Sequence, residues 1–553
     1  MAVPRQAAFW VGTFCAASLM AGSLGATEAP AMTEGTPPLP ALRAAPGALL
    51  EFALPLPPDA EVTITAADRL QSAVAMRLAE ALTDVSPRLP RKEREAIAAY
   101  YADAGYAPLW VKDGAWTPAA NRLIARLRAA QEDGLEALDY PIPAVASTKG
   151  EPLEDWAEAE VRLSATAVLY ARDARGGRIE PSRLSSLMTP KLDLPGAEDV
   201  LRAVSGSADP GAALAAYNPQ QPGYRALKAK LAEIRQNRPG TPMVRVPLGP
   251  ALRVGMRDPR VPLIRARFGI GPAGGDETSY DERVASAVAT FQREKGLPAS
   301  GVLTPKTVAA LSGPSPAQLE ADLIANMERW RWLPADLGER HIFVNIPEFR
   351  LRLFEGRDMV HQTRVVVGKT DSQTPIFSDQ MEYVIVNPSW TVPPSILKKE
   401  FLPALARDPS YAARRGYEVI RRNGQISVRQ PPGERNALGY VKFIFPNDHA
   451  VYLHDTPSRS LFAAERRAFS HGCVRVDQPF RLAEEVLSRQ GNWSEEKLKG
   501  LVGKGERYIR LQEKLPVHLA YFTLAVDEHG QLKRFDDLYG HHAKVRAALG
   551  LDG

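Results

Sequence analysis

The spacing of apolar residues changes near His341, and this change limits what the chain can fold into. Over residues 68–236, apolar residues recur every three or four positions, which is the spacing of helices that bury one face. From His341 onward the period becomes two, as in the segment 349–354, which is typical of half-buried strands. We therefore predict a multidomain α+β protein, with a helical scaffold domain at 68–236 and a mainly-β domain at 340–540.

A short unit between these two parts, residues 250–313, has helical spacing interrupted by Gly and Pro. We predict three helices there. Its stretches Phe291-Gln292, Gly296-Leu297 and Gly301-Val302-Leu303 resemble the peptidoglycan-binding domain type 1 family. That resemblance implies binding to peptidoglycan, and a helical spacer that has lost binding is the alternative. A linker rich in Pro and Gly, at 239–242, precedes the unit.

The β part contains an insertion at 396–438, which starts with helical spacing and then becomes polar. We expect this insertion to be a helical lid that caps a site. Two further helices are predicted, at 480–488 and 494–501.

The first 26 residues read as a secretory signal peptide, with Arg5, an apolar core at 7–20 and small residues at Gly25-Ala26. Residues 27–67 are rich in Pro and Ala and are expected to form a tether. No later stretch approaches the ~20 apolar residues that a membrane-spanning helix needs. We expect an exported, periplasmic protein without an integral membrane span after leader removal; an uncleaved anchor is the alternative.

The chain has two cysteines, and Cys15 lies in the predicted leader, so Cys473 would be the single thiol of the mature protein. It stands in the string Ser-His-Gly-Cys-Val-Arg at 470–475, and His454 lies nineteen residues upstream (473 − 454). A thiol attacks as thiolate, and a nearby imidazole can take its proton. Cys473 is therefore a candidate nucleophile. An inert, buried cysteine is the alternative.

Charge and composition exclude several other functions. The net charge of +5 is modest for 553 residues; it fits work near anionic polymers and is too weak to argue for nucleic acid. A single mature thiol rules out a zinc site with several thiolates, and no HExxH spacing occurs. A site built from histidines alone, or from histidines and carboxylates, stays open. No metal or organic cofactor is expected, because attack by a thiol with an imidazole as base needs none.

The cysteine motif and its upstream histidine resemble the signature of L,D-transpeptidases with the YkuD-type catalytic domain. Supporting stretches stand at 367–369, 374–375, 387–390 and 436–439. Together with the helical scaffold and the binding unit, they resemble the large, YcbB-like periplasmic branch. The resemblance implies a role in cell wall biogenesis and cell shape, with peptidoglycan stem peptides and glycan as partners.

The family's arrangement implies a role for each residue of the motif. Cys473 would be the nucleophile, and His454 would be the general base and later the general acid. His471 and Gly472 would shape the turn, whose backbone amides would bind the oxyanion. The expected substrate-binding residues are Arg475 for a carboxylate, Tyr452 for the oxyanion, Trp390 as an apolar wall, and Ser470.

The implied reaction has two steps and leaves the acceptor open. Cys473 would acylate at diaminopimelate and release terminal D-alanine, and the amine of a second stem would then resolve the thioester into a 3→3 cross-link. The alternatives are an L,D-carboxypeptidase, transfer to another amine, and a wall-binding scaffold without catalysis. A papain-like peptidase is weaker, because its cysteine precedes its histidine.

Overall fold

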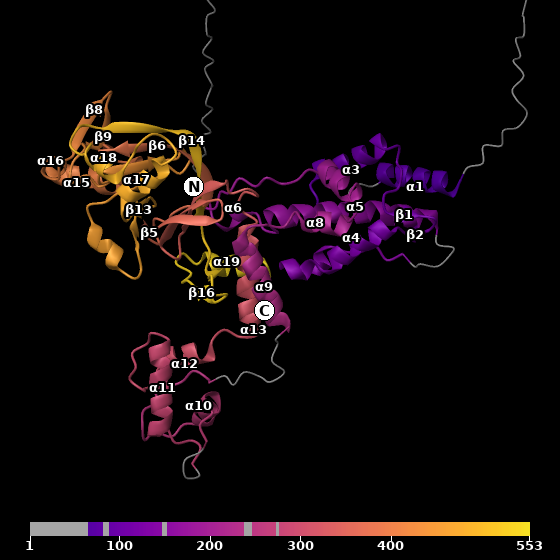
Figure 1. Ribbon diagram of the computed structural model, residues 1–553, viewed down its shortest axis with the longest axis horizontal. Helices are drawn as coiled ribbons and strands as arrows, with labels where there is room; N and C mark the ends of the chain where they lie inside the picture. Colours follow the sequence, from indigo (N-terminus) through magenta and orange to yellow (C-terminus); the bar gives the residue numbers. More distant parts are fainter. Residues whose placement is uncertain (1–64, 81–87, 146–151, 237–245, 272–275, 553) are drawn as a thin grey trace, which may run out of the picture. The chain divides into compact units, whose positions relative to one another are not determined.

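The computed structural model describes residues 65–80, 88–145, 152–236, 246–271 and 276–552 (Figure 1). The predicted signal peptide with Cys15, nearly all of the predicted tether and the predicted linker at 239–242 lie outside these described residues. Within the described ranges, no helix combines the length and the apolar composition that a membrane crossing requires.

The scaffold domain is a set of helices around α5 (Leu153–Gly176), which is buried along most of its length. The carboxylate of Glu160 in α5 accepts hydrogen bonds from the Tyr101 hydroxyl and from the backbone amides of residues 109–111. This buried carboxylate therefore orders the domain rather than facing solvent. The other elements are α1 (Ala66–Glu80), α3 (Arg91–Asp103), β1 (Val111–Lys112), β2 (Ala115–Trp116), α4 (Pro118–Arg128), α6 (Pro181–Leu184), α7 (Ala197–Ser205), α8 (Pro210–Ala215) and α9 (Pro222–Gln236).

The small unit has the three helices that its spacing predicts: α10 (Val261–Phe268), α11 (Glu282–Glu294) and α12 (Pro305–Ser312). Asp281 and Thr304 cap α11 and α12 by accepting backbone N–H bonds. The unit has its own apolar core, centred on residues such as Tyr280 and Val288. Gln292 accepts a hydrogen bond from the Gly301 amide at 2.9 Å, which joins α11 to the loop before α12.

The mainly-β domain follows α13 (Pro316–Trp330) and is built on one large sheet. The strand order is β12-β5-β13-β11-β10-β6-β14-β3-β4, and β4 also pairs with β5, so the sheet closes on itself. Apolar residues of alternate positions fill the interior. The strands are β3 (Arg340–Asn345), β4 (Arg350–Glu355), β5 (Asp358–Gly368), β6 (Phe377–Val386), β10 (Val441–Ile444), β11 (Leu453–His454), β12 (Ala468–Ser470), β13 (Val474–Val476) and β14 (Arg507–Ala520).

Helices α17 (Pro479–Leu487), α18 (Glu495–Lys499) and α19 (His541–Ala548) accompany this sheet, and β15 (Leu524–Val526) pairs with β16 (Leu532–Arg534). The first two agree with the helices predicted at 480–488 and 494–501. The multidomain α+β fold class is confirmed.

The insertion, which we call the lid, has a small core of Val392, Phe401 and Val428; that it caps a site stays a prediction. Its first half is helical, as predicted: α14 (Pro394–Ile396), the π-helical turn η3 (Leu397–Phe401), α15 (Leu402–Arg407) and α16 (Tyr411–Arg414). The polar second half is a hairpin, β8 (Glu418–Arg422) and β9 (Gln425–Gln430), which joins β7 (Trp390–Thr391) in a three-stranded sheet. Asn423-Gly424 forms the tight turn, with positive φ at both residues, and this pair was the hairpin signal in the sequence.

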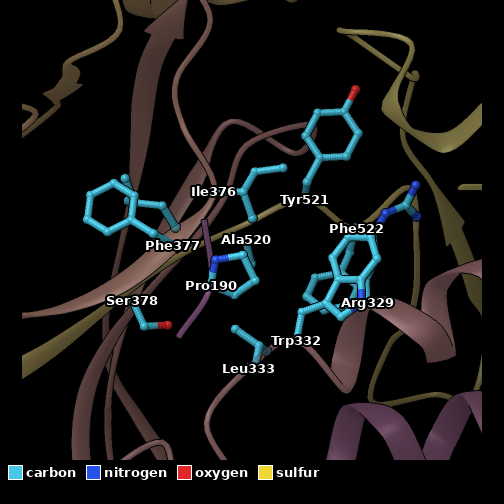
Figure 2. Close-up of a pocket in the computed structure, with 11 residues that line it drawn as sticks. Pro190, Arg329, Trp332, Leu333, Ile376, Phe377, Ser378, Ala520, Tyr521 and Phe522 are labelled. Atoms are coloured by element: carbon cyan, nitrogen blue, oxygen red, sulfur yellow. The ribbon is translucent and has the colours of Figure 1, made fainter. Parts of the chain in front are cut away.

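The segment between α6 and α7 of the scaffold domain touches the β domain directly. Met188 forms a parallel bridge to Ile376, and Pro190 lies among Ile376, Leu333 and Trp332 (Figure 2). The space that remains there is only about 10 Å³, which is enough for about one water and far too small for a substrate. This contact is therefore packing rather than a binding site.

Candidate active site

Strand register brings the predicted catalytic residues together. Strand β11 lies between β10 and β13, where Lys442 is opposite His454 and His454 is opposite Arg475. The neighbouring pair, Leu453 with Val474, is buried in the interior. Because side chains alternate along a strand, Tyr452, His454, Cys473 and Arg475 lie on the other face, side by side.

These side chains line one groove of about 400 Å³, a volume suited to a peptide-sized ligand. The lid contributes the other wall through residues such as Pro394 and Ile396. The predicted site residues that line the groove are Trp390, Tyr452, His454, Ser470, His471, Cys473 and Arg475. Gly472 lies in the turn between them.

The turn that carries Cys473 is fixed by buried hydrogen bonds. The Ser470 hydroxyl donates to the Cys473 carbonyl oxygen and accepts from the Gly472 amide, so Ser470 supports the turn from inside. Gly472 has φ of +111°, a conformation that favours glycine. The buried Thr374 hydroxyl donates to the Gly472 carbonyl oxygen at 2.8 Å and accepts from the Gly368 amide at 2.9 Å. The nucleophile is therefore held in one position.

His454 is buried, and its ring is oriented by the backbone. Its Nδ1 lies 2.5 Å from the Asp455 carbonyl oxygen. A carbonyl can only accept, so Nδ1 carries the proton and Nε2 is left with a lone pair. Burial, followed by the charge of Arg475, lowers the pKa of His454 to about 3. At neutral pH the imidazole is therefore neutral and able to accept a proton.

Cys473 is partly exposed in the groove and carries a protonated thiol at rest. Burial of the sulfur raises the thiol pKa, while hydrogen bonds from the backbone and the hydroxyl of Tyr452 lower it. The positive charges of Lys442 and Arg475 also lower it. The surroundings thus oppose a resting thiolate by desolvation and stabilise one that forms during reaction.

Two further side chains face the groove, those of Arg475 and His471. The guanidinium Nε of Arg475 is buried and has no hydrogen-bond partner among the described residues. His471 Nε2 lies 3.0 Å from Oε1 of Glu400 in η3. That pair joins the nucleophile turn to the lid.

Sequence reasoning missed several residues that shape this site. Tyr539 donates to the Gly368 carbonyl oxygen at 2.6 Å and braces the Thr374 turn, and Thr189 meets the groove residue His449 at 2.6 Å. Lys442 and Glu400 also went unpredicted. None of them lies in the cysteine motif, so only folding identifies them.

No cluster of three or more His, Cys, Asp or Glu side chains within the described ranges is arranged to hold a metal ion. The groove offers a thiol, an imidazole, hydroxyls and guanidinium nitrogens. A thiol and an imidazole in one groove are suited to nucleophilic acyl transfer.

Three protein families match successive parts of the chain. Residues 95–231 match a scaffold domain, residues 263–311 a peptidoglycan binding domain, and residues 339–503 the L,D-transpeptidase catalytic domain. A curated protein of Haemophilus influenzae, provisionally named an L,D-transpeptidase, is 32% identical over 244 residues, which are 41% of this chain and 49% of that protein. The chain thus spans about half the length of this relative. It carries a YkuD L,D-transpeptidase catalytic domain beside a peptidoglycan binding domain.

Solved structures with partial similarity include two L,D-transpeptidase structures. The Ldtfm–avibactam carbamoyl enzyme is 14% identical, with 34% of this chain and 50% of that chain covered and a TM-score of 0.19. An L,D-transpeptidase from Xylanimonas cellulosilytica is 16% identical, with 49% and 98% covered and a TM-score of 0.16. At these scores they add nothing to the assignment, which depends on the domain matches.

Proposed function

We propose that this protein is a peptidoglycan L,D-transpeptidase that forms 3→3 cross-links between diaminopimelate residues through a thioester on Cys473. The observation that carries the proposal is the shared groove of Cys473 and His454 inside the segment that matches the L,D-transpeptidase catalytic domain. The peptidoglycan binding domain supports the substrate class.

Acylation begins with proton transfer from the thiol. His454 Nε2 accepts the Cys473 proton, and the sulfur attacks the carbonyl at the L-centre of diaminopimelate in a tetrapeptide stem. The amide C–N bond then breaks, and the imidazolium returns its proton to the departing amine of D-alanine. The low pKa of His454 favours this return of the proton to the amine, whereas uptake of the proton from the thiol, whose own pKa burial raises, is the harder half of the step.

The oxyanion of the tetrahedral intermediate needs donors aimed at its oxygen. The Gly472 amide already donates to Ser470 Oγ, so it is less suited to this task. The Cys473 amide and the Tyr452 hydroxyl are the donors we assign. Tyr452 is favoured because it lines the groove together with Cys473 and its hydroxyl lowers the pKa of the thiol, so the hydroxyl can also reach a carbonyl bonded to that sulfur.

Resolution of the thioester requires an amine and the exclusion of water. The side-chain amine of a second stem attacks the thioester, His454 accepts a proton from that amine, and the C–S bond breaks as the thiol is reformed. Arg475, with its unpartnered Nε, would bind a stem-peptide carboxylate. Trp390 and the lid prolines would form the apolar wall that limits hydrolysis.

Cell-wall chemistry of this kind takes place outside the cytoplasm. We assign the protein to the periplasm, with its predicted signal peptide as the route of export. The three-helix unit would hold the enzyme on peptidoglycan and raise the local concentration of stems.

The test is incubation of the purified full chain with tetrapeptide-bearing muropeptides, followed by product analysis by mass. We expect cross-linked dimers with release of D-alanine, and none with Cys473→Ala at an unchanged melting temperature. Tripeptide without dimers would make the protein an L,D-carboxypeptidase. Absence of any product, together with a native thiol that resists alkylation, would favour a wall-binding scaffold.

A further inference from the structure

One cation lies beside the reacting pair and has no part in the mechanism above. The register of β10, β11 and β13 sets Lys442, His454 and Arg475 in a row across three neighbouring strands. The imidazole therefore has a cationic residue on each side. Arg475 opens into the groove, whereas Lys442 does not line it, so substrate contact is not the task of Lys442.

The ammonium of Lys442 is held against Tyr452. Its Nζ lies 3.9 Å from the centroid of the Tyr452 ring, a close cation–π contact. Tyr452 lines the same groove as Cys473, and its hydroxyl and backbone N–H lower the pKa of the thiol. Lys442 thus reaches the nucleophile through one intervening side chain.

Lys442 also lacks the partner that a half-buried lysine normally has. Among the described residues, no carboxylate lies within ion-pair distance of its Nζ. Glu506 contributes a favourable charge from further away, but its carboxylate accepts hydrogen bonds from the Ser389 amide and hydroxyl. Burying a cation without a paired anion costs free energy, which points to a charge kept for another reason.

We propose that Lys442 is a positioning residue of the site, whose ammonium holds the Tyr452 ring and stabilises the Cys473 thiolate from the neighbouring strand. This role of Lys442 rests on the proposed function, because it assumes that Cys473 reacts as a thiolate. The experiment that tests it does not depend on the transpeptidase activity. A thiolate beside Lys442 gains a favourable interaction, while an imidazolium at His454 is opposed by the same charge. Lys442 therefore favours the thiolate during attack and then favours return of the proton from His454 to the leaving amine.

The charges around the sulfur agree with this role. Lys442 and Arg475 lower the pKa of Cys473, and the thiolate in turn raises the pKa of Lys442, which burial otherwise lowers. The titratable and charged groups around the thiol and the lysine, from every element packed there, are Lys442, His449, Tyr452, His454, His471, Arg475, Glu506 and, on the lid, Glu400.

The test is the pH dependence of Cys473 alkylation by iodoacetamide, followed by intact mass in the full chain. Lys442→Met should raise the midpoint of the alkylation profile by about one pH unit, and Lys442→Arg should restore it. Lys504→Met, an exposed lysine of the same domain, is the matched control and should leave the midpoint unchanged. Lys442→Gln is the second neutral variant if the methionine variant folds poorly.

An unchanged midpoint in a folded Lys442→Met or Lys442→Gln protein would overturn the proposal. A shift that Lys442→Arg fails to reverse would do so too, because it would trace the effect to packing. Alkylation needs no peptidoglycan, so the result stands even if the transpeptidase assay fails.

Discussion

The floor of the groove, which carries His454 and the turn of Cys473, and the lid are held by different kinds of interaction. On the floor, buried hydrogen bonds from Ser470 and Thr374 fix the nucleophile turn, and the His454 ring is oriented by a backbone carbonyl. The lid depends on a core of three buried side chains. Within the described residues, the lid meets the turn of Cys473 through His471 and Glu400, whose side chains are 39% and 51% exposed.

The two kinds of interaction differ in how firmly they hold a side chain. Buried hydrogen bonds in a low-dielectric setting hold atoms firmly, whereas an exposed ion pair contributes about 0–1 kcal/mol. The floor therefore sets the position and protonation of the reacting groups. That the lid controls access to these groups stays a prediction.

The largest effect is expected for the imidazole of the floor. His454→Gln removes the proton acceptor and should slow acylation of Cys473 by roughly 100-fold or more. Acylation by a stem-peptide substrate, followed by intact mass, measures this. Binding to isolated peptidoglycan should stay unchanged, since the three-helix unit is untouched; equal losses in both assays would contradict the assigned role.

The same variant should change how stability depends on pH. The pKa of His454 falls from its ordinary 6.5 to about 3 in the fold. As the pH falls below 6.5, His454 becomes protonated in the unfolded chain but stays neutral in the folded chain. The free energy of unfolding therefore decreases. Between pH 7 and pH 4 this residue should cost roughly 2–3 kcal/mol.

Urea unfolding at the two pH values compares the parent with His454→Gln, which should lose less stability on acidification. His529→Gln, at an exposed position, is the control and should behave like the parent. Identical acid losses in the parent and in His454→Gln would mean that the ring is not buried in the neutral form.

Alanine substitutions at two glycines, one in the floor and one in the lid, allow a direct comparison of the two regions. A Cβ at Gly368 would lie 2.1 Å from the Ser372 carbonyl oxygen and 2.7 Å from the Thr374 amide, so Gly368→Ala must displace backbone. We expect a loss of roughly 2–3 kcal/mol and a marked fall in Cys473 alkylation. Gly424→Ala, in the lid hairpin, meets open space but keeps a φ of +74°, and should cost about 1 kcal/mol without changing alkylation. Urea unfolding and iodoacetamide kinetics measure both, and similar results at the two positions would remove the contrast.

A smaller effect is expected from the hydroxyl that supports the turn. Thr374→Val leaves the Gly472 carbonyl and the Gly368 amide without their partner, at a cost of roughly 1–2 kcal/mol. Acylation should fall because the turn loosens. Thr374→Ser keeps the hydroxyl and should restore acylation; failure of this rescue would show that the methyl group, not the hydrogen bond, matters.

The smallest effect is expected for the contact between His471 of the turn and Glu400 of the lid. Glu400→Gln removes the carboxylate from this exposed contact, so stability should change by less than about 1 kcal/mol. The acylation rate should change only a few-fold, because the lid opens more often while the floor is intact. Glu434→Gln, also exposed on the lid, is the matched control. A hundred-fold loss with Glu400→Gln would mean that the lid positions the nucleophile after all.

Much of the architecture could be predicted from local pattern. Helical spacing predicted the scaffold and the three-helix unit, and alternation predicted the β domain, because each period follows from the geometry of one element. The lid hairpin was missed although Asn423-Gly424 signalled it. The candidate pair could be proposed from the sequence as well, because His454 on β11 and Cys473, directly before the neighbouring strand β13, are close together in the chain.

The sequence by itself determined the fold class and put Cys473 and His454 forward as the candidate thiol and base, because these depend on short-range spacing. Tertiary structure decided everything that sets their chemistry. Thr374, Tyr539, Lys442 and Glu400 reach the site from distant segments, and only the closing of the sheet and the folding of the lid bring them there. The low pKa of His454 likewise depends on burial and on the charges of neighbouring strands, and neither exists before the strands pair.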